Sequence, residues 1–353
     1  MERWFSGGLK KWYGVNKRDL PWRNETDAYR IWLSEIILQQ TQVAQGLAYY
    51  RKFITNYPTI RHLAKASEDK VLKDWQGLGY YSRARNLHAT ARHIASNYKG
   101  VFPEIYKDIK ALKGVGDYTA AAIASFAFNQ PHAVVDGNVY RVLSRVFGIE
   151  TPMDSGKGKK QFQELASELL DRKDPATHNQ AIMEFGSQWC RPLNPDCEHC
   201  IFNSKCFAFK NELTASLPVK EKKTKIRARY FNYLVIIDKK QNVMINRRSE
   251  GDIWQGLYEF ALLETEKEIT GRALLKHPGF HKHTGKKAEI IYTSNGYKHV
   301  LSHQHLFAKF YVIKTNTVFK KSIHALSLKN LEKPAFPRLI EKFLNDCDLM
   351  EIC

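Results

Sequence analysis

Long apolar segments are absent from this sequence. No run approaches the roughly 20 consecutive apolar residues that a membrane-crossing helix needs, and no apolar stretch follows Met1 in the manner of a secretory signal. We therefore expect an intracellular protein with no membrane partner. Disulfide bonds are uncommon in that setting, so the six cysteines of the chain need another explanation.

Acidic residues are scarce relative to basic ones. The chain has 36 Asp and Glu against 55 Lys and Arg, for a formal net charge of +19. The excess is present both in the first 210 residues and in the remainder, so it does not come from one tail. A positive field suits a polyanion, most simply nucleic acid; a generally basic protein without such a partner is the alternative. The 353 residues, 43% of them hydrophobic, suffice for two or more domains.

Four of the six cysteines lie close together in a C-x6-C-x2-C-x5-C spacing, formed by Cys190, Cys197, Cys200 and Cys206. In an intracellular protein such a cluster indicates metal ligation. Zinc and an iron–sulfur cluster both accept four thiolates. Zinc ribbons usually pair two C-x2-C units, whereas a single C-x2-C with unequal arms favours iron–sulfur. A zinc protein would give a colourless preparation.

The periodicity of the sequence changes along the chain. Helical periodicity dominates residues 29–190 and predicts an all-α domain over 1–210, with the cysteines in a loop at 190–206. Residues 211–229 are polar and basic without periodicity and are interpreted as a linker. An α+β domain is expected over 230–353, with strands at 230–238, 243–247, 289–293 and 306–313.

The segment Gly114-Val115-Gly116 predicts a tight turn between two helices. The glycines allow positive φ angles and close approach of the backbone. The first N–H groups of the following helix have no partner within that helix, and with the helix dipole they favour an anion such as a DNA phosphate. The alternative is an ordinary glycine cap between two packed helices.

Two carboxylates are candidates for chemistry. Asp136 follows an apolar run and precedes a helix, so it fits an N-cap, worth about 1 kcal/mol, and the helix end would keep it ionised. Glu35 lies in a helix predicted over residues 29–45 and shares a face with Ile31 and Trp32. Burial there would raise its pKa and keep it protonated. The alternative for Glu35 is the edge of an amphipathic helix, paired with an arginine.

Two further segments contain candidate functional motifs. Residues 77–85, Gly-Leu-Gly-Tyr-Tyr-Ser-Arg-Ala-Arg, combine an aromatic wedge with arginines for phosphates, although a helix cap with surface tyrosines is the alternative. Residues 301–305 place two histidines in a loop before a strand. Their spacing could indicate a metal site, but a structural role is the more common one for histidines at a strand edge.

Taken together, these segments resemble the adenine DNA glycosylase (MutY) family over essentially the whole chain. The hairpin, Asp136 and the cysteines are shared with the wider endonuclease III superfamily, while the Glu35 segment and the C-terminal domain narrow the resemblance. The implied architecture is multidomain, with an all-α helix-hairpin-helix glycosylase domain that includes the iron–sulfur loop and a C-terminal α+β Nudix-like domain. The Nudix box is not recognisable, so no nucleotide hydrolysis is expected. The matching residues are Leu20-Pro21-Trp22-Arg23, Ser34-Glu35-Ile36, Leu38-Gln39-Gln40-Thr41, Gly77-Leu78-Gly79-Tyr80-Tyr81, Gly114-Val115-Gly116, Val135-Asp136-Gly137-Asn138 and the four cysteines.

The resemblance implies a substrate and a mechanism. Adenine opposite 8-oxoguanine or guanine in duplex DNA would be flipped into a pocket, where Glu35 protonates the base and Asp136 stabilises the oxocarbenium-like sugar. Two carboxylates with separated pKa values are the usual arrangement for breaking a glycosidic bond. Tyr118 and Asn138 would support them. The resemblance also places Trp22, Arg23, Leu38 and Val43 around the adenine, and it places Gln40, Thr41, Leu78, Tyr80, Ser302 and His303 at the opposite base.

Three positions distinguish this chain within the resemblance. Endonuclease III-type lyases carry a Schiff-base lysine two residues after the second hairpin glycine, where this chain has Tyr118, so a monofunctional glycosylase without strong lyase activity is expected. Asp117 puts a negative charge where a phosphate is expected, which is unfavourable unless Asp117 serves as the N-cap of the helix. Leu301 replaces an aromatic residue that the family often has before the Ser302-His303 pair.

The resemblance further implies one [4Fe-4S] cluster, which would shape a basic loop with Arg191 and Lys205 rather than break bonds. The partner would be mispaired double-stranded DNA, and the protein would act as a monomer in the bacterial cytoplasm, on the nucleoid. Two alternatives remain from the residues: a related enzyme of the superfamily that removes thymine or thymine glycol, and a non-catalytic DNA-binding protein with a redox-sensing cluster. Glu35 argues against the second, because a pure binder has no use for a carboxylic acid on an apolar face.

Overall fold

The computed structural model describes residues 3–221, 226–284, 288–316, 318–319 and 324–352. By their contacts the residues form two compact units, one of residues 1–65 and 86–223 and the other of residues 66–85 and 224–353. The second unit therefore includes a short segment from the first quarter of the chain. Among the described residues, no helix combines the length and apolarity that a bilayer-spanning helix needs.

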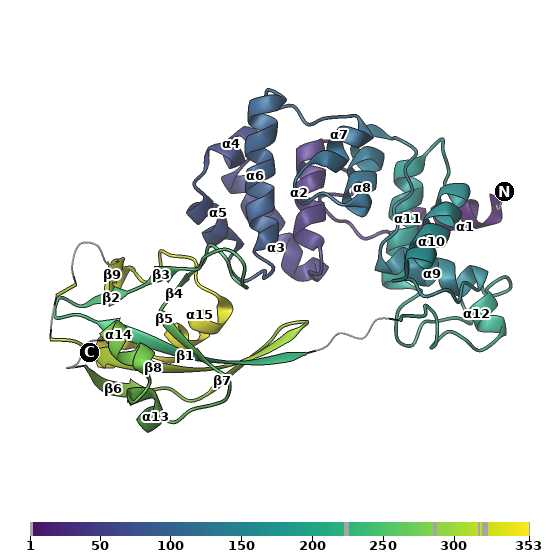
Figure 1. Cartoon of the computed structure of the whole chain (residues 1–353). Helices are drawn as coiled ribbons and strands as arrows, with labels where there is room; N and C mark the ends of the chain where they lie inside the picture. The colour runs from purple at the N-terminus through teal and green to yellow at the C-terminus, as the bar shows by residue number, and fades with distance from the viewer. Residues whose placement is uncertain (1–2, 222–225, 285–287, 317, 320–323, 353) are drawn as a thin grey trace. The chain divides into compact units, whose positions relative to one another are not determined.

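The first unit is helical, as the periodicity predicts (Figure 1). One hydrophobic cluster of this unit contains the buried side chains of Phe5, Val142, Phe162 and Phe185. The described helices are α1 (Arg3–Asn16), α2 (Ala28–Leu38), α3 (Val43–Asn56), α4 (Ile60–Lys65), α7 (Tyr106–Ala111), α8 (Asp117–Phe128), α9 (Gly137–Phe147), α10 (Gly156–Leu169), α11 (Pro175–Gln188) and α12 (Phe207–Lys210), and α6 (Ser82–Asn97) continues into this unit from the other.

The helix predicted over residues 29–45 is interrupted. α2 ends at Leu38, α3 begins at Val43, and the four residues between them form a turn in which Gln40 has a φ of +53°. The Thr41 N–H donates to the Leu38 carbonyl at 3.2 Å, which closes the turn. The polar Gln-Gln-Thr-Gln run thus ends the apolar helix that carries Glu35 and starts a new direction of the chain.

The second unit contains a mixed sheet, which confirms the α+β prediction. The order β6-β8-β1-β2-β9 forms its main path, with β5 paired to β1 and β7 paired to β8; β1 and β8 run parallel and the other pairs antiparallel. The strands of this sheet are β1 (Arg227–Ile237), β2 (Asn242–Met244), β5 (Ala261–Thr265), β6 (Glu289–Thr293), β7 (Tyr297–Val300), β8 (Gln304–Lys314) and β9 (Ala325–Ser327); β3 (Asn246–Arg247) and β4 (Tyr258–Glu259) form a separate pair.

Two hydrophobic clusters cover the two faces of this sheet. On one face Phe310 stacks on Phe343 of α15 with ring centroids 4.0 Å apart, and on the other Leu234 and Tyr311 pack with Leu274 and Phe280 from the short helices α13 and α14. The described helices of this unit are α5 (Glu68–Trp75), α13 (Gly271–Leu275), α14 (Pro278–Thr284), α15 (Arg338–Asp346) and α16 (Leu349–Ile352), with a 3-10 turn at Leu328–Asn330.

Strand β1 begins at Arg227, within the segment interpreted as linker. The sequence indicates a strand only from residue 230, because Arg227 and Arg229 interrupt the apolar pattern. In the structure the Arg229 side chain is 8% exposed and is surrounded by carboxylates, so a charged residue occupies a buried strand position.

Candidate active site

The hairpin glycines stand between α7 and α8. Gly114 has a φ of +81°, and a Cβ at this position would lie 2.8 Å from the Asn86 Cβ, so glycine is required for both reasons. Gly116 is the N-cap of α8 and supplies no side chain to it, and an added Cβ there would meet nothing within 4 Å. The start of α8 is therefore open to a ligand, as an anion site at a helix N-terminus requires.

Asp117 follows the cap rather than forming it. Its carboxylate pairs with the Lys110 ammonium from α7, which balances the negative charge at the helix start. Both side chains are largely exposed, so the pair is accessible to salt and to DNA.

Glu35 lies on α2, which Asp27 caps by accepting from the Tyr29 and Arg30 N–H groups. The Glu35 side chain is buried, with the residue 7% exposed. The Tyr118 hydroxyl donates to its Oε2 at 2.7 Å. Burial raises the pKa of Glu35 to about 7, against the opposing effects of the Tyr118 hydrogen bond and the Arg23 charge. At neutral pH a substantial fraction of Glu35 is therefore protonated.

Asp136 is the N-cap of α9, as predicted. Its Oδ1 accepts from the N–H groups of Asn138 and Val139 at 2.9 and 2.8 Å, and its Oδ2 accepts from the Asn138 side-chain amide at 2.8 Å. Burial nevertheless raises the pKa of Asp136 above its usual value, and these hydrogen bonds and Arg141 oppose the rise. The sequence predicted that the helix end would keep Asp136 ionised. In the structure the helix end only limits the rise in pKa that burial causes.

A cavity of about 180 Å³ brings these groups together. Its lining includes all four predicted catalytic residues, Glu35, Tyr118, Asp136 and Asn138, and all four residues predicted around the adenine, Trp22, Arg23, Leu38 and Val43. Thr41, predicted at the opposite base, lines it as well. The pocket therefore combines apolar walls with three carboxyl groups, the third being that of Glu184, and a few polar groups in an apolar cavity are typical of a site for a small heterocycle.

Glu184 is a residue of this cavity to which the sequence analysis assigned no role. It is fully buried on α11 and accepts from Arg18 Nε at 2.6 Å and from Arg23 Nη2 at 2.7 Å. Burial raises its pKa, but the two arginines outweigh this effect, so the pKa lies below its usual value and Glu184 is ionised. The sequence offered the same indication as for Glu35, a carboxylate within the apolar helical run Ala-Ile-Met-Glu-Phe.

Within the described part of the chain, one hydrogen-bond donor of Arg23 in this cavity lacks a partner. Its Nη2 is engaged by Glu184, whereas its buried Nε has no hydrogen-bond partner among the described residues. A buried donor without a partner is costly. A ligand with a hydrogen-bond acceptor, such as a ring nitrogen, would remove that cost.

The six residues predicted at the opposite base divide between the two units. Gln40 and Thr41 belong to the α2–α3 turn of the first unit, whereas Leu78, Tyr80, Ser302 and His303 belong to the second. Within the second unit the Tyr80 hydroxyl lies 2.8 Å from Ser302 Oγ, so two residues more than 200 positions apart are in direct contact. Tyr80 is 48% exposed and Leu78 is buried.

The four clustered cysteines lie in the loop that follows α11 and form no disulfide bond with one another. Burial raises the pKa of Cys197 and of Cys206, and it raises that of Cys200 to about 12. Arg145 Nη1 lies 3.5 Å from Cys190 Sγ, and the Phe202 N–H donates to Cys200 Sγ at 3.4 Å. Within the described residues, no three His, Cys, Asp or Glu side chains are arranged as a ready metal site.

Comparison with known proteins gives the family of the chain. Residues 33–172 match the family model described as HhH-GPD superfamily base excision DNA repair protein, and residues 232–346 match the NUDIX domain. The chain is 31% identical over 355 residues to the adenine DNA glycosylase of Buchnera aphidicola subsp. Acyrthosiphon pisum (strain APS), with 97% of both chains covered. It is 44% identical over 213 residues to the adenine DNA glycosylase of Homo sapiens, covering 58% of this chain and 39% of the human one.

Solved structures agree on the fold of the helical part. A thermostable thymine-DNA glycosylase aligns with a TM-score of 0.55 at 31% identity, covering 59% of this chain and 95% of its own. A trapped endonuclease III–DNA covalent intermediate aligns with a TM-score of 0.53 at 19% identity, covering 60% and 96%, which shows the fold alone. The match to the Buchnera enzyme extends over both domains, and on this ground the chain belongs to the adenine DNA glycosylase family.

Proposed function

We propose that this protein is a monofunctional glycosylase that hydrolyses the N-glycosidic bond of adenine mispaired with 8-oxoguanine or guanine in duplex DNA, as a step of base excision repair. The observation that carries the proposal is the cavity in which a buried, hydrogen-bonded Glu35 and a helix-capping Asp136 meet an apolar wall. Two relatives that match over most of the chain are named adenine DNA glycosylases, which supports removal of adenine.

The residues of the cavity suit a dissociative cleavage of the bond. The target adenine would enter the cavity after leaving the base stack. Glu35, with a pKa of about 7, would donate its proton to the adenine ring, which makes the base a better leaving group. As the bond to the sugar breaks, its electron pair leaves with the base and positive charge develops on the sugar. The Asp136 carboxylate, held by Asn138 and Val139, would stabilise that charge, directly or through a transient bond. Water would then add to the sugar carbon and give up a proton to a carboxylate.

Tyr118 determines what this enzyme would not do. Its hydroxyl is engaged with Glu35 and its pKa lies well above the usual value because of burial, so it offers neither an amine nor a ready nucleophile to the sugar. Without a lysine at this position no Schiff base forms by the route of the lyases. Base removal should therefore leave the DNA strand intact.

Recognition of the opposite base is assigned to Gln40, Thr41, Leu78, Tyr80, Ser302 and His303. The contact between Tyr80 and Ser302 supports a shared role for two of them, because each hydroxyl fixes the orientation of the other. In this arrangement the hydroxyl pair and the exposed His303 would present hydrogen-bonding groups to an oxidised guanine.

The four cysteines would hold a [4Fe-4S] cluster. Four thiols from one loop match the donors that such a cluster requires, and the N–H groups of Arg145 and Phe202 already point to two of the sulfurs, as is common around thiolate-bound metals. When bound, the cluster would supply fixed geometry and charge to the loop rather than bond breaking. Arg191 and Lys205 are in this loop and would face DNA phosphates.

The first test of the proposal is the variant Glu35→Gln. If Glu35 is the general acid, the purified variant should still bind a duplex with adenine opposite 8-oxoguanine, while adenine release falls to the background rate. Release at the wild-type rate would refute the assignment. Exchanging the target adenine for thymine tests the related activity named for the thermostable thymine-DNA glycosylase, and release of thymine in preference to adenine would favour that alternative.

A further inference from the structure

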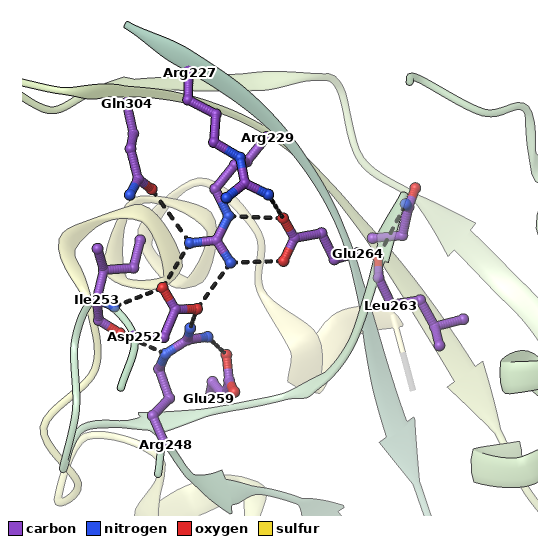
Figure 2. Close-up of polar contacts among 10 residues, drawn as sticks. Arg227, Arg229, Arg248, Asp252, Ile253, Glu259, Leu263, Glu264 and Gln304 are labelled. Carbon is purple, nitrogen blue, oxygen red and sulfur yellow. Dashed lines mark hydrogen bonds and ion pairs between the residues drawn. The ribbon is translucent and has the colours of Figure 1, made fainter. Parts of the chain in front are cut away.

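A network of charges that contains two buried arginines lies within the second unit, around the start of β1. Arg229 uses all five of its N–H donors (Figure 2). It bonds Glu264 through Nε and Nη2 at 2.7 and 2.6 Å, and Asp252 through Nη1 and Nη2 at 2.7 and 2.8 Å. Its fifth donor reaches the Gln304 side-chain oxygen at 3.2 Å. The guanidinium is thus fixed by two bidentate pairs, and its remaining Nη1 donor faces Gln304.

A second arginine extends the network. Arg248, whose side chain is 5% exposed, donates to Asp252 Oδ2 at 2.7 Å and to Glu259, and its Nε donates to the Ile253 carbonyl at 2.9 Å. The two arginines therefore connect β1, β4, β5 and the loop at residues 248–257 to the first residue of β8.

Gln304 directly follows the turn that contains Ser302 and His303. This turn joins β7 to β8, and the Leu301 N–H donates to the Gln304 carbonyl at 2.8 Å. The His303 carbonyl accepts from the Arg227 N–H at 3.0 Å. The turn is therefore held at its C-terminal end by the backbone of β1 and by the Arg229 side chain, while Ser302 and His303 stay exposed.

Stability alone gives little reason for such a network. Burying ions costs desolvation that their attraction often fails to exceed, and a well-packed apolar replacement can be equally stable. What bidentate arginine pairs do supply is fixed geometry. The geometry fixed here is that of the turn beside Gln304, and the same turn carries the hydroxyl that contacts Tyr80.

We propose that Arg229 is a positioning residue for recognition of the opposite base, acting through Gln304 to hold the Leu301–His303 turn where Ser302 and His303 meet an oxidised guanine. Arg229 itself, buried among carboxylates, does not touch the DNA. The inference rests on the proposed function, because it assumes that this turn reads the base opposite the adenine.

The test uses Gln304 rather than Arg229, because removing the arginine would break all five of its hydrogen bonds at once and leave Asp252 and Glu264 without their shared cation. Gln304→Met keeps the length of the side chain and removes the acceptor, whereas Gln304→Glu keeps an acceptor for Arg229. Glu268→Gln is the matched control. It breaks the ion pair between Glu268 and Lys309, and Lys309 lies on β8, the strand that begins at Gln304. All variants are to be made in the full-length chain, and circular dichroism and thermal unfolding are to be used to check that each variant folds.

The measured quantity is the ratio of single-turnover adenine release rates from duplexes with 8-oxoguanine and with guanine opposite the adenine. We expect Gln304→Met to lower this ratio about tenfold, because a shift of the turn by roughly an ångström can cost up to about 100-fold in rate. The rate on the 8-oxoguanine duplex should fall, and the rate on the guanine duplex should stay unchanged. Gln304→Glu and Glu268→Gln should keep the wild-type ratio.

Three results would overturn the inference in distinguishable ways. A wild-type preference that survives in Gln304→Met refutes the positioning role alone. An equal loss of rate on both duplexes in Gln304→Met shows a merely structural role. A wild-type ratio near one refutes recognition of the opposite base, and the positioning role with it, while adenine release itself would still stand.

Discussion

Replacing Tyr118 with phenylalanine removes the hydroxyl that donates to Glu35 at 2.7 Å and leaves the ring in place. In the wild-type protein burial raises the pKa of Glu35 to about 7, and the Tyr118 hydrogen bond works against that rise because it favours the ionised carboxylate. Without the hydroxyl the pKa of Glu35 should rise further. A hydrogen bond to a charged group contributes about 1.5–3 kcal/mol, and about 1.4 kcal/mol corresponds to one pKa unit, so we expect a shift of at least about one unit.

The assay is the pH dependence of adenine release in a single turnover. The reaction needs the protonated form of Glu35, so the wild-type rate should fall as the pH rises through about 7. In Tyr118→Phe the falling limb should lie at least about one pH unit higher, by the bond energy given above. Tyr140→Phe, a half-buried tyrosine on α9, is the control and should keep the wild-type profile. A falling limb that stays in place or moves to lower pH in Tyr118→Phe would refute the reasoning.

Three further variants test other parts of the account. Glu35→Gln should raise the free energy of unfolding by up to about 3 kcal/mol at pH 8 and by much less near pH 4. The reason is that the pKa of Glu35 is about 7 in the folded protein against an ordinary value of 4.5, so the wild-type protein loses stability as the pH rises between these values. Denaturant titrations at both pH values measure this effect, and an equal effect at both would contradict it. Asp136→Asn should keep the cap of α9, so the free energy of unfolding should change by less than about 1 kcal/mol. The single-turnover rate of adenine release should fall at least about 100-fold. A rate within tenfold of wild type would show that the negative charge of Asp136 is not needed. Cys200→Ser should abolish the visible absorption expected of an iron–sulfur protein, whereas a colourless wild-type protein with bound zinc would contradict the cluster.

The structure brings both predicted carboxylates, Glu35 and Asp136, into one cavity, and each of them leaves a local pattern in the sequence. Asp136 stands between an apolar run and a helix, and Glu35 interrupts an apolar helical face, so both carboxylates could be selected without knowing the fold. Glu184 leaves the same pattern, but its role depends on Arg18 and Arg23, which lie more than 150 residues away in the chain. Local sequence cannot show which distant cation neutralises a buried carboxylate.

The remaining differences also come from tertiary contacts. The break after α2 depends on a left-handed Gln40, a conformation that glutamine rarely adopts and that composition does not predict. The early start of β1 depends on carboxylates that surround Arg229, so the last three residues of the segment interpreted as linker belong to a strand. The contact between Tyr80 and Ser302 joins segments that no sequence pattern relates.

The measurement that tests the central claim most directly is adenine release from a duplex with adenine opposite 8-oxoguanine, sampled before and after alkali. The account predicts free adenine and strand breaks that form only after alkali, because Glu35 and Asp136 break the glycosidic bond and Tyr118 offers no amine to the sugar. Strand breaks without alkali would contradict the monofunctional mechanism. No release of adenine at all would contradict the roles assigned to the cavity between α2, α8 and α9.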